Sequence, residues 1–297
     1  MASAAYSEDN NIQEPAAKLF EDNLDWRSVF AFNTETFGPG SLLGRKDATE
    51  VVLVRELDAA LCKLNPKLAA TPEGRAKLNV ARDQLLDADP TKTLLQHNEA
   101  KWRLMRDGIT LKSPGGNAAE DVHVTVIDFQ NPTANDFLVV RELWVQSGPF
   151  RRRCDLVGFV NGLPLAVIEA KRPDSNAKKG PTVKEGISQT IRNQLHGEIP
   201  LLFAYSQLLL SINGIEGRYG TCGTPEKFWA AWREEDIGDG EMTAIKNQPL
   251  SSEQRSALFS HRPAADLGWY QSLVAAGELA VSDQDRLLIS LLSPERL

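Results

Sequence analysis

The spacing of apolar residues predicts that the first third of the chain is mainly helical. Ala16, Leu19, Phe20 and Leu24 are spaced for one face of a helix, and Pro15 suits its first turn. After a stretch rich in glycine and proline, an amphipathic pattern begins that stops before an Asn-Pro pair. The further helices predicted in this third cover residues 48–64, 72–86 and 91–106.

From Val122 onward the period of the apolar residues changes to that of strands. After this first strand, others are predicted over residues 136–146, 155–160, 163–171, 201–204 and 207–212. A helix over 183–195 would cross between strands 163–171 and 201–204, a short helix is expected over 225–235, and the remainder looks helical. The fold class predicted is therefore α/β: a mixed sheet flanked by helices, with a helical N-terminal part.

The composition is that of a globular protein without a membrane span. Of 297 residues, 42% are hydrophobic and 25% charged, enough for one large or two small domains. No apolar run approaches the roughly 20 residues that cross a bilayer, and the acidic start of the chain lacks the layout of a secretory signal. The expected compartment is the cytoplasm. Three scattered cysteines, without a CxxC pair, indicate neither a disulfide framework nor a zinc site.

The charge of the chain is uneven. A net charge of −7 argues against a protein that coats nucleic acid without specificity, because such binding depends on neutralising phosphates. Between residues 151 and 192, however, the chain has nine basic and four acidic residues, which gives this segment a net charge of +5. An anionic substrate would be guided to this segment.

The same segment contains the residues most typical of catalysis. Asn161-Gly162 supplies a hairpin turn, and alternation along the second strand places Glu169 and Lys171 on one face. The face of Asp155 depends on the turn. With a strict two-residue loop, the numbers of paired residues add up to 323, which puts Asp155 and Glu169 on opposite faces of the hairpin. A glycine bulge at the turn, or an equivalent bend, would put both side chains on the same face. The hypothesis of a joint site requires such a bend.

If the three side chains converge, they suit the hydrolysis of a phosphodiester. Asp155, Glu169 and the backbone carbonyl of Ala170 make a set of hard oxygens that fits Mg²⁺. Lys171 would then lie beside the attacking water and stabilise the charge that grows on the phosphate.

These residues also carry a resemblance to known nucleases. On this hairpin an aspartate is followed, after thirteen residues, by the motif Glu-x-Lys. This pattern resembles that of the PD-(D/E)xK nuclease superfamily. The run RRRCDLVGFVNGLPLAVIEAKRP is in particular similar to the N-terminal nuclease domain of the restriction (R) subunit of Type I restriction-modification enzymes. The resemblance extends over residues 50–66, 128–135, 189–203 and 219–232, and residues 285–297 resemble the lead into the family's helicase-like motor. It implies a restriction-endonuclease-like fold.

The resemblance suggests further site residues. Gln189 matches the glutamine of a Gln-x-x-x-Tyr pair, whereas the tyrosine position holds Asn193. Glu14 is the candidate for an acidic residue that the first helix adds to some sites of the superfamily. Cys154 replaces the usual proline before the aspartate.

Several arginines are candidates for contact with DNA. They are Arg151, Arg152, Arg153, Arg172 and Arg192. For the first three, a solvated strand edge that discourages pairing is an equally open interpretation.

The resemblance also implies an organisation and a set of partners. Residues 1–13 are expected to be a flexible lead-in, 14–240 the nuclease domain, and 241–297 a helical linker toward a motor, whose GxxxxGK[ST] phosphate loop does not occur in this chain. The implied partners are double-stranded DNA and the methylation and specificity subunits, with no membrane. Mg²⁺ is the expected cofactor, and ATP would act only through the motor. The alternatives are a stand-alone defence or repair nuclease and a catalytically degenerate docking domain.

Overall fold

The computed structural model describes residues 12–32, 34–113, 115–116, 118–172, 182–233, 238–259 and 264–296, apart from the side chains of 257 and 258. The helices are α1 (Glu14–Asn23), α2 (Val54–Leu64), α3 (Pro66–Ala69), α4 (Pro72–Leu86), α5 (Leu94–Asp107), α6 (Val183–Asn193), α7 (Pro200–Tyr205), α8 (Asp239–Lys246), α9 (Ser252–Phe259), α10 (Ala264–Ala276) and α11 (Asp283–Leu292). The strands are β1 (Arg27–Phe30), β2 (Ile109–Leu111), β3 (Val122–Val124), β4 (Phe137–Ser147), β5 (Phe150–Val160), β6 (Leu163–Ala170), β7 (Leu208–Ile212) and β8 (Gly217–Gly220).

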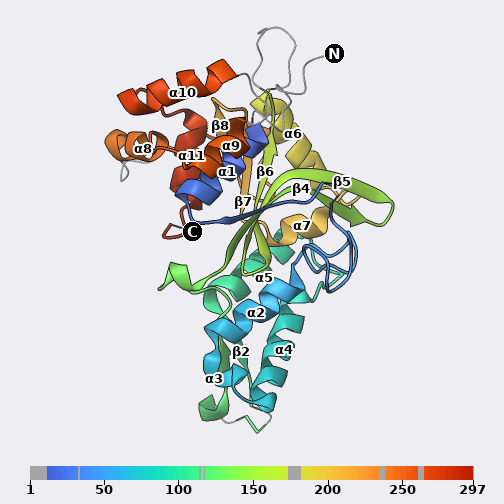
Figure 1. The fold of residues 1–297 in the computed structure, drawn as a ribbon. Helices are drawn as coiled ribbons and strands as arrows, with labels where there is room; N and C mark the ends of the chain where they lie inside the picture. The colour runs from blue at the N-terminus through green and yellow to red at the C-terminus, as the bar shows by residue number, and fades with distance from the viewer. Residues whose placement is uncertain are drawn as a thin grey trace.

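A mixed sheet of six strands forms the centre of the fold, in the order β1-β4-β5-β6-β7-β8 (Figure 1). The pairs β1·β4 and β6·β7 are parallel, and the other neighbouring pairs are antiparallel. Strands β5 and β6 are buried along most of their length, which explains their nearly continuous apolar sequence. The α/β class and the mixed sheet expected from the sequence are confirmed.

Helices cover both faces of the sheet. On one face α6 packs against β6 and β7; on the other, Trp26, which follows α1, lies against Gly158, and α11 lies against Gly217 of β8. The indole of Trp26 also donates a hydrogen bond of 3.0 Å to the carbonyl of Leu292 at the end of α11. Residues 283–292 therefore belong to the core around the sheet. No helix among the described residues is long and apolar enough to cross a membrane.

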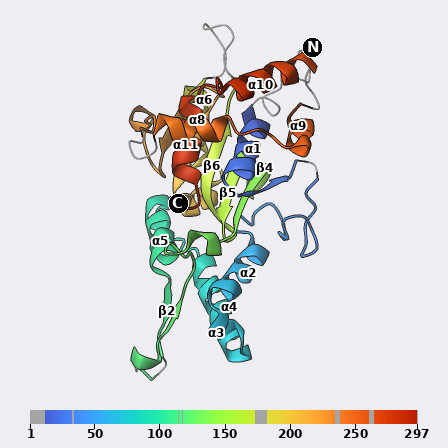
Figure 2. The same ribbon diagram turned by 60° about the vertical axis from the view of Figure 1, so that its left-hand side comes forward.

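A second, helical part extends from one end of the sheet. It contains α2, α3, α4 and α5 together with a two-stranded ribbon of β2 and β3 (Figures 1 and 2). Asn65, after α2, joins this part to the chain that enters the sheet, because its side chain exchanges two hydrogen bonds of 2.9 Å with the backbone of Thr125.

One predicted strand is a helix. Residues 201–204 lie in α7, which Pro200 begins at its first position. The run Leu-Leu-Phe-Ala is apolar on every side and buried except for Leu201, so its sequence has no period that separates a buried strand from a short buried helix.

Other boundaries also differ from the prediction. The helix predicted over 48–64 begins only at Val54, and the helix predicted over 225–235 is a single 3-10 turn, Glu226–Phe228, within its described residues. Strands β1, β2 and β8 were not predicted. The predicted strand that begins at Val122 is β3, and it pairs with β2 outside the main sheet. Of the expected lead-in, residues 1–11 lie outside the described residues, and Ile12 and Gln13 are buried.

The turn between β5 and β6 is fixed by a buried asparagine. Asn161 and Gly162 both have positive φ, 53° and 79°, as a two-residue type I′ turn requires. The fully buried side chain of Asn161 donates to the carbonyl of Val126 and to Oδ1 of Asn135, and accepts from the backbone N–H of Asp136, at 2.8–2.9 Å. The turn thus joins the end of the hairpin to the segments on either side of it.

We predict that Asn161→Ala lowers the free energy of unfolding by about 3 kcal/mol, because it leaves buried partners without hydrogen bonds and because alanine adopts positive φ less readily than asparagine. Asn161→Gly loses the same hydrogen bonds but tolerates the backbone, so it should cost about 1 kcal/mol less. Urea denaturation of both variants measures the difference. Equal midpoints for Asn161→Ala and the unaltered chain would contradict this account.

Candidate active site

An extra residue in β6 decides which side chains meet. Next to the turn, Val160 pairs with Leu163 and Phe159 with Pro164, so paired positions sum to 323. Beyond the bulge, Gly158 pairs with Ala166, so the residue numbers of a pair add up to 324. Leu165 is left without a partner in β5 and is the additional residue. Continued along the strands, this register places Asp155 opposite Glu169, on the same face.

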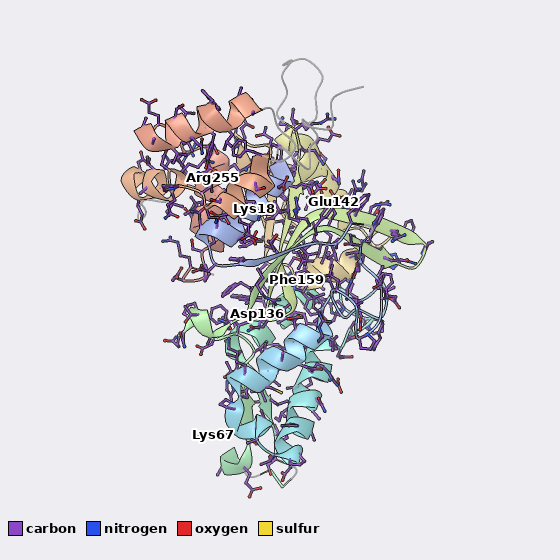
Figure 3. The ribbon with its side chains drawn as sticks, in the orientation of Figure 1. Lys18, Lys67, Asp136, Glu142, Phe159 and Arg255 are labelled. Atoms are coloured by element: carbon purple, nitrogen blue, oxygen red, sulfur yellow. The ribbon has the colours of Figure 1, made fainter. Side chains whose placement is uncertain are left out.

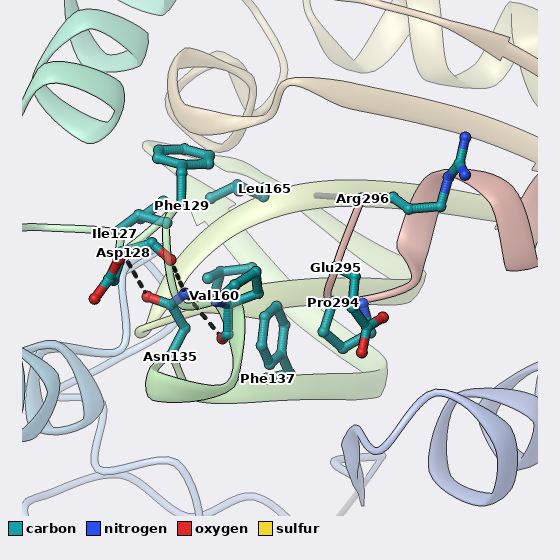
Figure 4. A pocket seen from close by; sticks show the side chains of 11 residues that line it. Ile127, Asp128, Phe129, Asn135, Phe137, Val160, Leu165, Pro294, Glu295 and Arg296 are labelled. Atoms are coloured by element: carbon teal, nitrogen blue, oxygen red, sulfur yellow. Dashed lines mark hydrogen bonds between the residues drawn. The ribbon is translucent and has the colours of Figure 1, made fainter.

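The bend that the hypothesis required is therefore present, but not where it was expected. The Asn-Gly turn is a regular two-residue turn, and the extra residue lies within the strand. Leu165 is buried and lines a small cavity of about 160 Å³ with Phe137, Val160 and residues 294–296 (Figure 4). Asp155, Glu169 and Lys171 do not line this cavity, so it is separate from the candidate site.

Asp155, Glu169 and Lys171 form a compact buried group. Their exposed fractions are 6%, 3% and 7%. The backbone N–H of Ala170 donates to Oδ2 of Asp155 at 2.8 Å, and the ammonium of Lys171 donates to Oε1 of Glu169 at 2.5 Å. Charges so far from water are tolerated only when paired and hydrogen-bonded, and here each carboxylate has such a contact.

Helix α6 covers this group through a close approach at Gly186. A Cβ atom at Gly186 would lie 2.2 Å from Oγ of Ser211 and 3.3 Å from Cγ of Glu169. Ser211, the neighbour of Glu169 in β7, donates a hydrogen bond of 2.9 Å to the carbonyl of Val183 at the start of the helix. The missing side chain of Gly186 thus allows α6 to lie directly on the carboxylate face.

The two residues suggested for α6 and α1 occupy different surroundings. Gln189 is half-buried one turn after Gly186, on the helix that covers the carboxylates. Asn193, at the position of the family tyrosine, is buried, and its Oδ1 has no hydrogen-bond partner among the described residues. Glu14 is half-buried in the first turn of α1, a helix on the opposite side of the sheet. Its part in the site stays a prediction.

The three consecutive arginines do not act as one patch, because alternation along β5 separates Arg152 from its neighbours. Arg152 lies 2.5 Å from a carboxylate oxygen of Glu198. Arg151 lies 4.2 Å from the ring centroid of Trp144. Arg153 pairs with Glu142 at 2.5 Å and lies over Phe32. Their side chains belong to a paired strand, since β5 begins at Phe150 rather than at 155. Arg172 and Arg192 are exposed.

Glu142 is a residue that the sequence analysis missed. It is buried in the middle of β4, at the place labelled in Figure 3, and its φ is +57°. Because Arg141 pairs with Leu156 and Leu143 with Cys154, Glu142 lies opposite Asp155. Positive φ costs a residue other than glycine about 1–2 kcal/mol. The available signal was an acidic residue, preceded by Arg141, within a largely apolar strand.

The donor set fits a metal ion that takes few protein ligands. Asp155, Glu169 and the carbonyl of Ala170 would offer hard oxygens of the kind that Mg²⁺ prefers, with water completing its shell. Within the described part of the chain, no group of three or more His, Cys, Asp or Glu side chains could hold a metal ion. A site built from many side chains, as for structural zinc, is therefore not formed by these residues.

Fold and site together define an α/β domain with two carboxylates and a lysine at the end of a central strand. The chain belongs to the family described as Type I restriction enzyme R protein N terminus, whose model matches residues 5–228.

Similar curated proteins agree with this family assignment. The chain is 28% identical over 193 residues to the Type I restriction enzyme HindI endonuclease subunit of Haemophilus influenzae, covering 65% of this chain and 17% of that protein. It is 33% identical over 151 residues to the putative Type I restriction enzyme MjaIXP endonuclease subunit of Methanocaldococcus jannaschii, covering 49% and 14%. With the EcoprrI endonuclease subunit of Escherichia coli it shares 26% identity, covering 66% and 61%. The chain thus spans less than a fifth of the first two relatives.

We predict that Gly186→Ala lowers the free energy of unfolding by about 1–3 kcal/mol, because the new methyl group displaces α6 from β7. Ser211→Ala removes the nearest obstructing atom. The double variant Gly186→Ala/Ser211→Ala should therefore lose less than the sum of the two single variants. Denaturation of the four chains gives the coupling, and strict additivity would argue against the close approach.

A second prediction concerns the cysteines. Burial, and then the negative charges of Glu169 and Asp155, raise the pKa of Cys154, and burial raises the pKa of Cys222 to about 11. At pH 8 iodoacetamide should alkylate the exposed Cys62 and react with the other two at least about 100-fold more slowly, because only the thiolate reacts. Mass spectrometry of the peptides measures the rates. Rapid labelling of Cys154 in the folded chain would show that it is accessible.

Proposed function

We propose that the chain is the Mg²⁺-dependent endonuclease domain of a Type I restriction enzyme R subunit and hydrolyses phosphodiester bonds of double-stranded DNA. The observation that carries the proposal is the bulge at Leu165, because it sets Asp155 opposite Glu169 with Lys171 beside them. Membership of the R-subunit N-terminal family supports the same conclusion.

Each residue of the group has a separate task in this proposal. Asp155, Glu169 and the Ala170 carbonyl would hold Mg²⁺, which, when bound, supplies positive charge and lowers the pKa of water. The N–H of Ala170 fixes the orientation of the Asp155 carboxylate. Lys171, held by Glu169, places an ammonium where negative charge develops on the phosphate.

The proposed partners are supported by membership of this family. The relatives named above are described as endonuclease subunits of Type I restriction enzymes, one of them as putative. We propose that this domain works with methylation and specificity subunits and that ATP acts through a motor outside this chain.

We expect Asp155→Ala and Lys171→Ala to reduce nicking of plasmid DNA by about 100-fold or more, since each removes a group that acts on the developing charge. The assay uses Mg²⁺ and a restriction complex reconstituted with the R subunit that carries this domain. The matched controls are Lys77→Ala and Asp83→Ala, which change a half-buried lysine and an exposed aspartate of α4, and both variants should cut normally.

Assembly of the complex and its ATPase activity should persist in all four variants. Undiminished nicking by Asp155→Ala or Lys171→Ala would move the active site elsewhere. Wild-type complex that never nicks, although it assembles and hydrolyses ATP, would favour a docking role for the domain.

A further inference from the structure

We propose that Glu142 is a positioning residue that holds Arg153 ready to bind a DNA phosphate beside Asp155 and Glu169. This inference rests on the proposed nuclease function. It adds a residue from a neighbouring strand, and it singles out one of the three consecutive arginines.

The first observation is that β4 keeps a strained residue at one point only. Glu142 has φ of +57°, although the pairs on both sides of it have regular register with β5. Glycine or asparagine would adopt this conformation more readily than glutamate. A long acidic side chain at such a place indicates that the carboxylate itself is used.

The second observation is the ion pair that this carboxylate makes. The side chain of Glu142 is 6% exposed, and its Oε2 lies 2.5 Å from Nε of Arg153, in an ion pair rather than an aligned hydrogen bond. Because a buried carboxylate needs a compensating cation, this contact constrains the guanidinium strongly.

The third observation concerns the hydrogen-bond donors of Arg153 that could still bind a phosphate. Its side chain is 40% exposed, and the ring of Phe32 lies 4.9 Å from the guanidinium carbon. Within the described residues, neither terminal nitrogen of Arg153 makes a hydrogen bond. A guanidinium fixed through Nε and an aromatic ring therefore presents two further donor groups to solvent, in the planar arrangement that suits phosphate.

Position along β5 favours Arg153 over its neighbours. Arg153 is two residues from Asp155 on the same side of the strand, whereas Arg151 is four residues away. One terminal nitrogen of Arg152 pairs with Glu198 and the other donates to the backbone carbonyl of Arg151. A phosphodiester that reaches the carboxylates thus meets the guanidinium of Arg153 first.

The test is binding of a fluorescent 20-base-pair duplex to this chain, without divalent ions, over a range of salt concentrations. We expect Arg153→Ala and Glu142→Gln each to weaken binding by about fivefold to tenfold at low salt, and the double variant to be little weaker than either. The slope of log K against log salt should fall by about 0.9 in Arg153→Ala, the loss of one phosphate contact.

Glu142→Gly separates positioning from a structural role. It relieves the backbone, so the melting temperature should be equal or higher, while DNA binding falls as in Glu142→Gln. Glu73→Gln and Arg106→Ala, which change exposed charges in the helical part, are controls and should bind as the unaltered chain does.

Binding by Glu142→Gly equal to that of the unaltered chain overturns the proposal, as does additive loss in the double variant or no binding by the unaltered chain. These results leave the proposed function standing if Asp155→Ala still abolishes nicking. Nicking that survives in Asp155→Ala would instead remove the proposed function, whatever the binding data show.

Discussion

Three charged groups lie almost out of water at the end of β6, and the surrounding structure makes that arrangement possible. An isolated buried carboxylate is too costly to keep ionised, so each must have compensating contacts. Lys171 compensates Glu169, and the N–H of Ala170 compensates Asp155. The apolar strands on both sides, and helix α6, which approaches Ser211 and Glu169 closely at Gly186, keep solvent away from the group. The low polarity that makes these charges costly also strengthens their effect on a bound anion.

The sequence was sufficient for the class of fold and for most of the elements. Amphipathic periods located α1 and α4, and the Asn-Gly pair located the hairpin. Alternation alone placed Glu169 and Lys171 together, because that inference needs only one strand. These features follow from local periodicity, which a single sequence displays directly.

The features that the sequence did not predict depend on contacts between distant segments of the chain. Nothing in the residues around Leu165 marks it as the extra one, since the bulge forms only when β5 and β6 pair. The short strands β1 and β8 exist because β4 and β7 offer edges to them, and residues 201–204 become a helix in an apolar setting that suits either structure. Glu142 escaped notice because its significance comes from the residue opposite it on another strand.

The bulge also constrains how this hairpin can change during evolution. Loss of Leu165 alone would leave a well-paired sheet whose two carboxylates face opposite sides, so that a stable protein would lose the proposed site in one step. Inserting one residue elsewhere between Asp155 and Glu169 would restore the original number of residues between them. Both carboxylates could then return to the same face, even though the insertion adds no new functional group. If the two carboxylates form the proposed site, the lengths between them that keep both on one face should differ from one another by even numbers of residues.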